Sequence, residues 1–108
     1  MTEKKPSDFD KFQDVYTIVA NIPPGKVITY GRISMMVGNL TARRVGYAMR
    51  MAPPGLPAHR VVNSTGKLSP EYVFGGEDAQ RAILKKEGVV FTAAGNIDMK
   101  KSLWEMNE

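Results

Sequence analysis

The sequence predicts a mainly α-helical winged helix-turn-helix domain with a small β-hairpin. Three observations predict it: two short helix-like segments around a tight turn, a proline-rich connection, and two short strand-like runs around a glycine turn. A chain of 108 residues with 43% hydrophobic residues suits one compact core. We therefore expect a single domain over residues 1–108, with its core at about residues 7–92 and an undecided tail at residues 93–108.

An amphipathic first helix is expected to begin at Ser7. Asp10 follows Ser7 at the spacing of a helix start, and apolar residues then recur at helical intervals until Pro23-Pro24-Gly25. The apolar residues of this pattern are Phe9, Phe12, Val15, Tyr16 and Val19. The sequence therefore predicts one helix that ends in a turn.

The next segment predicts the first helix of the pair. Residues 27–30 are rich in β-branched side chains and are expected to be extended. After them, Ile33, Met36 and Val37 form a brief apolar stripe, and Gly38-Asn39 closes it. A short helix that ends at a glycine follows from this pattern.

The second helix of the pair is expected from Ala42 to about Met51. Thr41 is placed to cap it, because a threonine oxygen can accept from the first free amides of a helix. One face would hold Val45, Ala48 and Met49, and the other would present Arg43, Gly46, Tyr47 and Arg50.

The wing is expected after the proline-rich stretch at residues 53–57, which cannot be helix interior because proline lacks the amide donor. Residues 60–62 and 67–68 resemble two short strands, and the turn residues 63–66 separate them. An antiparallel hairpin is the prediction.

The last elements are a helix and an ambiguous tail. From about Glu77 to Glu87 the chain places Ala79, Ile83 and Leu84 at helical offsets, and Gly88 can end that helix. Residues 89–91 are β-like, and the final dozen residues fit a short strand or a packed or frayed tail equally well.

Composition limits the chemistry. A formal net charge of +4 and a pI near 9.5 favour polyanionic partners. The absence of cysteine excludes disulfides, thiolate zinc sites and cysteine nucleophiles, and His59 is the single imidazole, so no metal or cofactor is predicted. No apolar run approaches the roughly 20 residues of a membrane span, so a cytoplasmic protein is expected.

The exposed face of the second helix has two explanations. Gly46 costs about 1 kcal/mol relative to alanine inside a helix. The glycine either packs against a neighbouring element or allows a DNA minor groove to approach the backbone, where small residues beside Arg43, Arg44 and Arg50 would fit. The residues alone leave both open.

Tyr30 and His59 are likewise ambiguous. Tyr30 follows a strand-like stretch, so its ring could displace a base, or it could be an ordinary core or rim tyrosine. His59 is the one group suited to proton transfer near neutral pH, and it could equally be a structural hydrogen-bonding residue.

Four ordered segments resemble a known family. They are Ile22-Pro-Pro-Gly-Lys-Val-Ile-Thr-Tyr-Gly31, Ala42-Arg-Arg-Val-Gly-Tyr-Ala-Met49, Pro57-Ala-His-Arg-Val-Val62 and Leu84-Lys-Lys-Glu-Gly88. They are similar to the signature segments of the C-terminal domain of O6-alkylguanine-DNA alkyltransferases, across about residues 7–92. The resemblance implies that fold. Ala58 stands where those enzymes have the cysteine that accepts the alkyl group, so the chain resembles the alkyltransferase-like proteins that lack it.

The resemblance implies a sensor of O6-alkylguanine in duplex DNA that is not an enzyme and directs lesions to nucleotide excision repair proteins. Tyr30 would rotate the nucleotide's phosphate, and Arg43 would replace the flipped base in the stack. The minor-groove helix would carry Thr41, Ala42, Arg44, Gly46, Tyr47 and Arg50. The lesion pocket would involve Pro57, Ala58, His59, Arg60, Val61 and Val62, with Ser69 and Tyr72 on the opposite lip at residues 69–76. Glu87 would be a structural support.

Three other functions stay open at this point. A winged-helix DNA-binding module would bind without regard to alkylation, and an alkyl transferase would need another nucleophile. A protein-interaction domain would bind no duplex. A monomer is the expected state.

Overall fold

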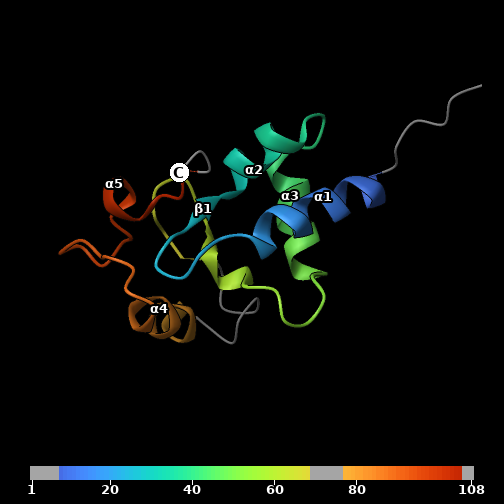
Figure 1. Cartoon of the computed structure of the whole chain (residues 1–108). Helices are drawn as coiled ribbons and strands as arrows, with labels where there is room; N and C mark the ends of the chain where they lie inside the picture. Colours follow the sequence, from blue (N-terminus) through green and yellow to red (C-terminus); the bar gives the residue numbers. More distant parts are fainter. Residues whose placement is uncertain (1–7, 69–76, 106–108) are drawn as a thin grey trace, which may run out of the picture.

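The computed structural model describes residues 8–68 and 77–105, so Ser7 lies outside the described residues. Figure 1 shows α1, α2 and α3 toward one end of the molecule and α4 and α5 toward the other. The elements in chain order are α1 (Asp8–Ala20), β1 (Ile28–Thr29), α2 (Tyr30–Val37), α3 (Ala42–Arg50), the 3-10 helix η1 (Ala58–Arg60), β2 (Val61–Val62), α4 (Glu77–Lys86) and α5 (Met99–Ser102).

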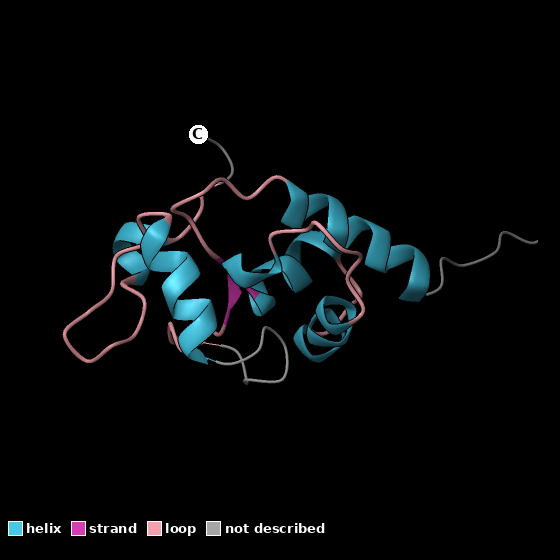
Figure 2. Cartoon of the chain, turned by 90° about the horizontal axis from the view of Figure 1, so that it is seen from below, coloured by secondary structure: helices cyan, strands magenta, loops and turns pink. Residues whose placement is uncertain are grey.

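Two clusters of buried side chains lie on either side of the strand pair. β1 and β2 run parallel, with Ile28 opposite Val61 and Thr29 opposite Val62. Ile28 and Val61 belong to the core that packs α1, α2 and α3 together, which we call the first core. Val62 belongs to the second core, which includes Leu84 of α4. Because successive side chains of a strand point to opposite faces, this short pair serves both cores, and Figure 2 shows it between the helices.

The predicted helix-turn-helix is confirmed. Thr29 Oγ1 accepts from the Arg32 amide at 3.0 Å at the start of α2, and Thr41 Oγ1 accepts from the Arg44 amide at 3.1 Å at the start of α3. Gly38 ends α2 with a φ of 79°, a conformation that favours glycine. The strand stops at Thr29, so Tyr30 is the first residue of α2 rather than extended.

The apolar patterns of the helices are mostly confirmed. Phe12, Val15 and Val19 of α1 are buried, as are the three predicted core residues of α3. In α2 and α4 the prediction is partly wrong. Met36 of the predicted α2 stripe is 38% exposed. In α4, Leu84 is fully buried, Ile83 is 42% exposed, and the polar Gln80 lies in the interior at 0% exposure.

The predicted antiparallel hairpin is wrong. Residues 67 and 68 form no strand. The turn is closed by backbone hydrogen bonds from the Asn63 amide to the Lys67 carbonyl at 3.2 Å and from the Gly66 amide to the Asn63 carbonyl at 2.9 Å. β2 pairs instead with β1, far away in sequence. The physical reason is burial: Val61 and Val62 are both 0% exposed, and such two-sided burial is typical of parallel pairing.

The tail is packed. Val89 to Phe91 forms no strand, and Phe91 makes a single antiparallel bridge with Ile97. Asp98 then caps α5, and Leu103 bridges to Val27. The packed tail was one of the two alternatives, although its helical turn was not expected. Among the residues described, no helix has the length and apolarity to cross a membrane.

Candidate nucleic-acid interface

α3 presents one small and basic face to solvent. Arg43 and Arg50 are exposed on it, with the half-buried Gly46 between them in the helix. Thr41 and Ala42 at the start of α3 are exposed as well. The opposite face is held in the first core by Val45, Ala48 and Met49. The exposed face of the helix therefore carries small side chains flanked by arginines.

Gly46 is not required by packing among the described residues. A Cβ added to Gly46 would meet no atom within 4 Å outside the helix's own neighbouring backbone. Of the two explanations left open by the sequence, packing against another element is contradicted. A surface cleared for the close approach of something outside the chain is consistent with the structure.

Arg44 is turned toward α1 instead of sharing the face with Arg43. Its guanidinium carbon lies 5.3 Å from the centre of the Phe12 ring and 4.9 Å from that of Tyr47. These distances are those of cation–π contacts, which attach the start of α3 to α1. Tyr47 takes part in this contact, and its side chain is 41% exposed at the edge of the exposed face.

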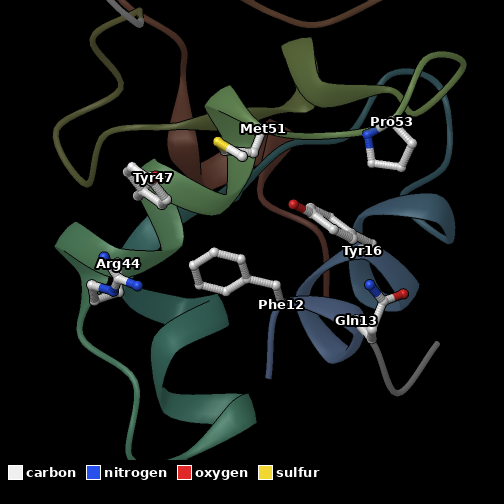
Figure 3. Close-up of a pocket in the computed structure, with 7 residues that line it drawn as sticks. All are labelled: Phe12, Gln13, Tyr16, Arg44, Tyr47, Met51 and Pro53. Carbon is white, nitrogen blue, oxygen red and sulfur yellow. The ribbon is translucent and has the colours of Figure 1, made fainter. Parts of the chain in front are cut away.

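A cavity of about 450 Å³ lies between α1 and the C-terminal half of α3. Figure 3 shows its side chains converging from the two helices and the loop after α3. Tyr16 donates a 2.9 Å hydrogen bond from its hydroxyl to the Ala48 carbonyl, and burial raises the pKa of that hydroxyl. Ala58 and His59 are not among its lining residues, which are Phe12, Gln13, Tyr16, Arg44, Tyr47, Met51 and Pro53.

Tyr30 and residues 57–62, which we call the pocket segment, do not line this cavity. Tyr30 is half-buried and packs against the first core at the start of α2. Pro57, Ala58 and His59 are half-buried at η1, whereas Val61 and Val62 are fully buried. The two valines therefore support the segment from inside. Ser69, Tyr72 and the predicted lip at residues 69–76 lie outside the described residues.

Glu87 joins His59 and Arg60 in a hydrogen-bonded network, in which the side chain of Glu87 is 17% exposed. His59 Nε2 lies 3.0 Å from Glu87 Oε2, Arg60 Nε donates to Oε1 at 3.0 Å, and Arg60 Nη2 donates to Oε2 at 2.5 Å. The Arg60 guanidinium lowers the pKa of the Glu87 carboxyl, His59 acts in the same direction, and burial opposes both. Two parallel bonds of this kind give a strong and directional pair.

Two further contacts fix the same segment. Arg60 Nη1 donates to the Ile22 carbonyl at 2.7 Å, and Gln80 Nε2 donates to the His59 carbonyl at 2.9 Å. η1 is therefore tied to α4 and to the turn after α1. The sequence pattern did not identify Gln80 as a site residue, although Gln80 precedes Leu84 by one helical turn. A polar residue on a buried helical stripe is the signal that could have found it.

Comparisons with known proteins agree with this arrangement. Residues 10–89 match the family described as "6-O-methylguanine DNA methyltransferase, DNA binding domain". An Escherichia coli K12 "DNA base-flipping protein" is 41% identical over 94% of this chain and 81% of its own length. The Schizosaccharomyces pombe "Alkyltransferase-like protein 1" is 44% identical over 72% of this chain and 75% of its own length.

Solved structures show the same fold. S. pombe Atl1, in complex with damaged DNA containing O6-carboxymethylguanine, superposes with a TM-score of 0.76 at 37% identity, covering 94% of this chain and 99% of that one. Mycobacterium tuberculosis O6-methylguanine methyltransferase gives a TM-score of 0.61 at 33% identity, covering 80% of this chain and 52% of that one. The helical fold with its small parallel strand pair is therefore shared with both, and it fits a winged helix-turn-helix domain, although the hairpin predicted at residues 60–68 is absent. The chain belongs to the family of the 6-O-methylguanine DNA methyltransferase DNA-binding domain.

Proposed function

We propose that this protein binds duplex DNA through α3 in the minor groove and recognises O6-alkylguanine by flipping the nucleotide out of the helix. The observation that carries the proposal is the exposed face of α3. There Gly46 has no side chain, so the helix backbone is accessible between Arg43 and Arg50. A minor groove about 6 Å wide admits small side chains and arginines better than long polar ones. Atl1, a structural match, was crystallised with alkylated DNA.

The proposed role of each flipping residue follows from its place. Tyr30, at the start of α2, would rotate the phosphate of the target nucleotide, and the exposed Arg43 would fill the gap left in the stack. Flipping a base costs a few kcal/mol, which a few good contacts supply. The extruded base would enter a pocket beside Ala58, with residues 57–62 on one side.

We further propose that binding leaves the alkyl group in place. Ala58 carries a methyl group where the alkyltransferases have their cysteine, and a methyl group is no nucleophile. The network of His59, Arg60 and Glu87 then holds the pocket segment without activating a thiol. Because the lesion persists, another repair activity must remove it. We propose that this protein acts as a monomer and that its partners are nucleotide excision repair proteins.

Binding to a fluorescent duplex with one O6-methylguanine, compared with its unmodified twin, tests the proposal. Wild type is expected to prefer the lesion, and Tyr30→Ala and Arg43→Ala are expected to abolish that preference. Arg50→Ala, which removes the same charge from the same face, is the control. It should lower the affinity for both duplexes by the same factor. Equal affinity of the wild type for the two duplexes would instead indicate a winged-helix protein without lesion specificity.

The absence of alkyl transfer is tested separately. After incubation with methylated duplex, the intact mass of the protein should be unchanged, and the methylated base should be recovered from the DNA. A protein mass increased by one methyl group would refute this part of the proposal.

A further inference from the structure

Five lysines gather at the end of the molecule that carries α4 and α5. They come from three segments joined by backbone hydrogen bonds: the Val27 amide donates to the Ser102 carbonyl at 2.9 Å, and the Asp98 amide to the Val90 carbonyl at 2.8 Å. Lys26 Nζ also reaches the Lys101 carbonyl at 3.3 Å. This lysine surface consists of Lys26, Lys85, Lys86, Lys100 and Lys101.

The charge of this surface is not neutralised within the part of the chain that the structure describes. None of the five lysines forms an ion pair with a described carboxylate. Asp98, the acidic group nearest in sequence to Lys100, accepts from the amides of Lys100 and Lys101 as the cap of α5. Lys85 lies 5.5 Å from the centre of the Phe91 ring.

Helix electrostatics account for only part of the cluster. Lys85 and Lys86 occupy the last turn of α4, where a positive charge is favourable. α5 has only four residues, so its dipole is small, and Lys26 lies in a turn. Positive charges placed at one end of the molecule in this way repel one another and lower the stability of the fold. A polyanion is the partner that would compensate them.

The lysine surface cannot belong to the α3 face. Figure 1 places α4 and α5 at the end away from α1 and α3, and the β1–β2 pair lies between the two cores. Lysine is a compact charge that contacts phosphates without reading sequence. We propose that the lysine surface binds the phosphate backbone of a second duplex segment, so that one molecule holds two segments. The binding of the first segment, at the α3 face, rests on the proposed function.

Capture of one duplex by another tests this proposal. A lesion duplex is attached to beads, saturated with protein at about 0.15 M salt, the physiological ionic strength, and mixed with a fluorescent duplex of unrelated sequence. Wild type is expected to retain the fluorescent duplex. K100Q/K101Q should lower its apparent affinity at least about tenfold and reduce the salt slope by about 0.9 for each phosphate that the protein no longer neutralises.

A matched variant controls for net charge. K11Q/R32Q removes two positive charges from α1 and α2 and should leave the capture of the second duplex unchanged. No capture by wild type, or full capture by K100Q/K101Q, would overturn the proposal. So would a loss of affinity for the bead-bound duplex in K100Q/K101Q, because the lysines would then contact the first segment. Replacing the lesion duplex by its unmodified twin tests lesion preference independently of capture.

Discussion

Gly46 is the residue at which we expect the stability of the fold and the proposed DNA binding to make opposite demands. The sequence left two reasons for a glycine inside a helix, and the empty space around its Cβ position excludes one of them among the described residues. The cost of the glycine in the free protein therefore has no compensation in its own fold. Such a residue is expected to be useful only when a partner is bound.

Gly46→Ala should therefore act in opposite directions on the two properties. We expect the free energy of unfolding to rise by about 0.5–1 kcal/mol, since alanine favours the helix. Affinity for duplex DNA should fall severalfold, because the added methyl group lies where the backbone is proposed to meet the groove. Urea unfolding and fluorescence anisotropy measure the two effects. A destabilised variant would show that packing requires the glycine.

Glu87 acts on stability through its charge. Glu87→Gln should lower the free energy of unfolding at neutral pH by about 1.5–3 kcal/mol, the range for hydrogen bonds to charged groups, because Arg60 and His59 lose their anionic partner. Glu105→Gln, which removes one negative charge at an exposed residue outside the network, is a matched comparison and should change little.

The pH dependence of the Glu87 contribution has a definite sign. The folded state lowers the pKa of Glu87 below its ordinary value of 4.5. Its stabilisation is therefore complete above about pH 4.5 and is lost as the pH falls through the lower folded-state value. Urea unfolding of wild type and Glu87→Gln across this range should show the gap between them closing in acid. A gap that stays constant down to about pH 2, well below the usual range for glutamate, would contradict the role of the carboxylate.

At the scale of elements, the four longer helices followed from local rules, whereas α5 and the strand pairing did not. Thr41 and Gly38 lie directly beside the helix ends that they define, and the apolar stripe of α3 repeats at helical spacing. The structure confirms all three. Residues 60–62 and 67–68 looked like a hairpin because both runs are short and a glycine turn separates them. The actual partner of β2 lies more than 30 residues earlier in the chain, which no local pattern identifies.

Loss of the cap of α3 should have a moderate cost. Thr41→Ala removes the acceptor for the Arg44 amide and should lower the free energy of unfolding by about 1 kcal/mol. Thr41→Ser keeps the oxygen and should remain within a few tenths of a kcal/mol of wild type. Thermal unfolding followed by circular dichroism compares the two. Equal destabilisation by alanine and serine would show that the methyl group of the threonine matters rather than its oxygen.

At the scale of the whole molecule, the two cores are expected to unfold together. They share the β1–β2 pair, whose Val61 faces the first core and Val62 the second. Trp104, the single tryptophan, packs against the first core. The expectation of one domain over residues 1–108 thus becomes a prediction about cooperativity.

Leu84→Ala tests that cooperativity from the opposite side of the molecule. Truncating this fully buried residue of the second core should cost about 2–5 kcal/mol. The unfolding midpoint seen by Trp104 fluorescence should fall as far as the midpoint seen by circular dichroism. If the tryptophan transition kept its wild-type midpoint while part of the helical signal melted early, the chain would contain two independent units.

Sequence by itself determined the four longer helices, the helix ends at Thr41 and Gly38, the family resemblance and the absence of cysteine, because each depends on residue type and spacing within short segments. Tertiary structure decided the parallel pairing of β1 with β2, the joining of Arg60 to both Glu87 and Ile22, the burial of Gln80, and the gathering of lysines from three segments. Those features arise where distant parts of the chain meet, and the choice among possible meetings depends on how all the apolar surfaces are buried at once.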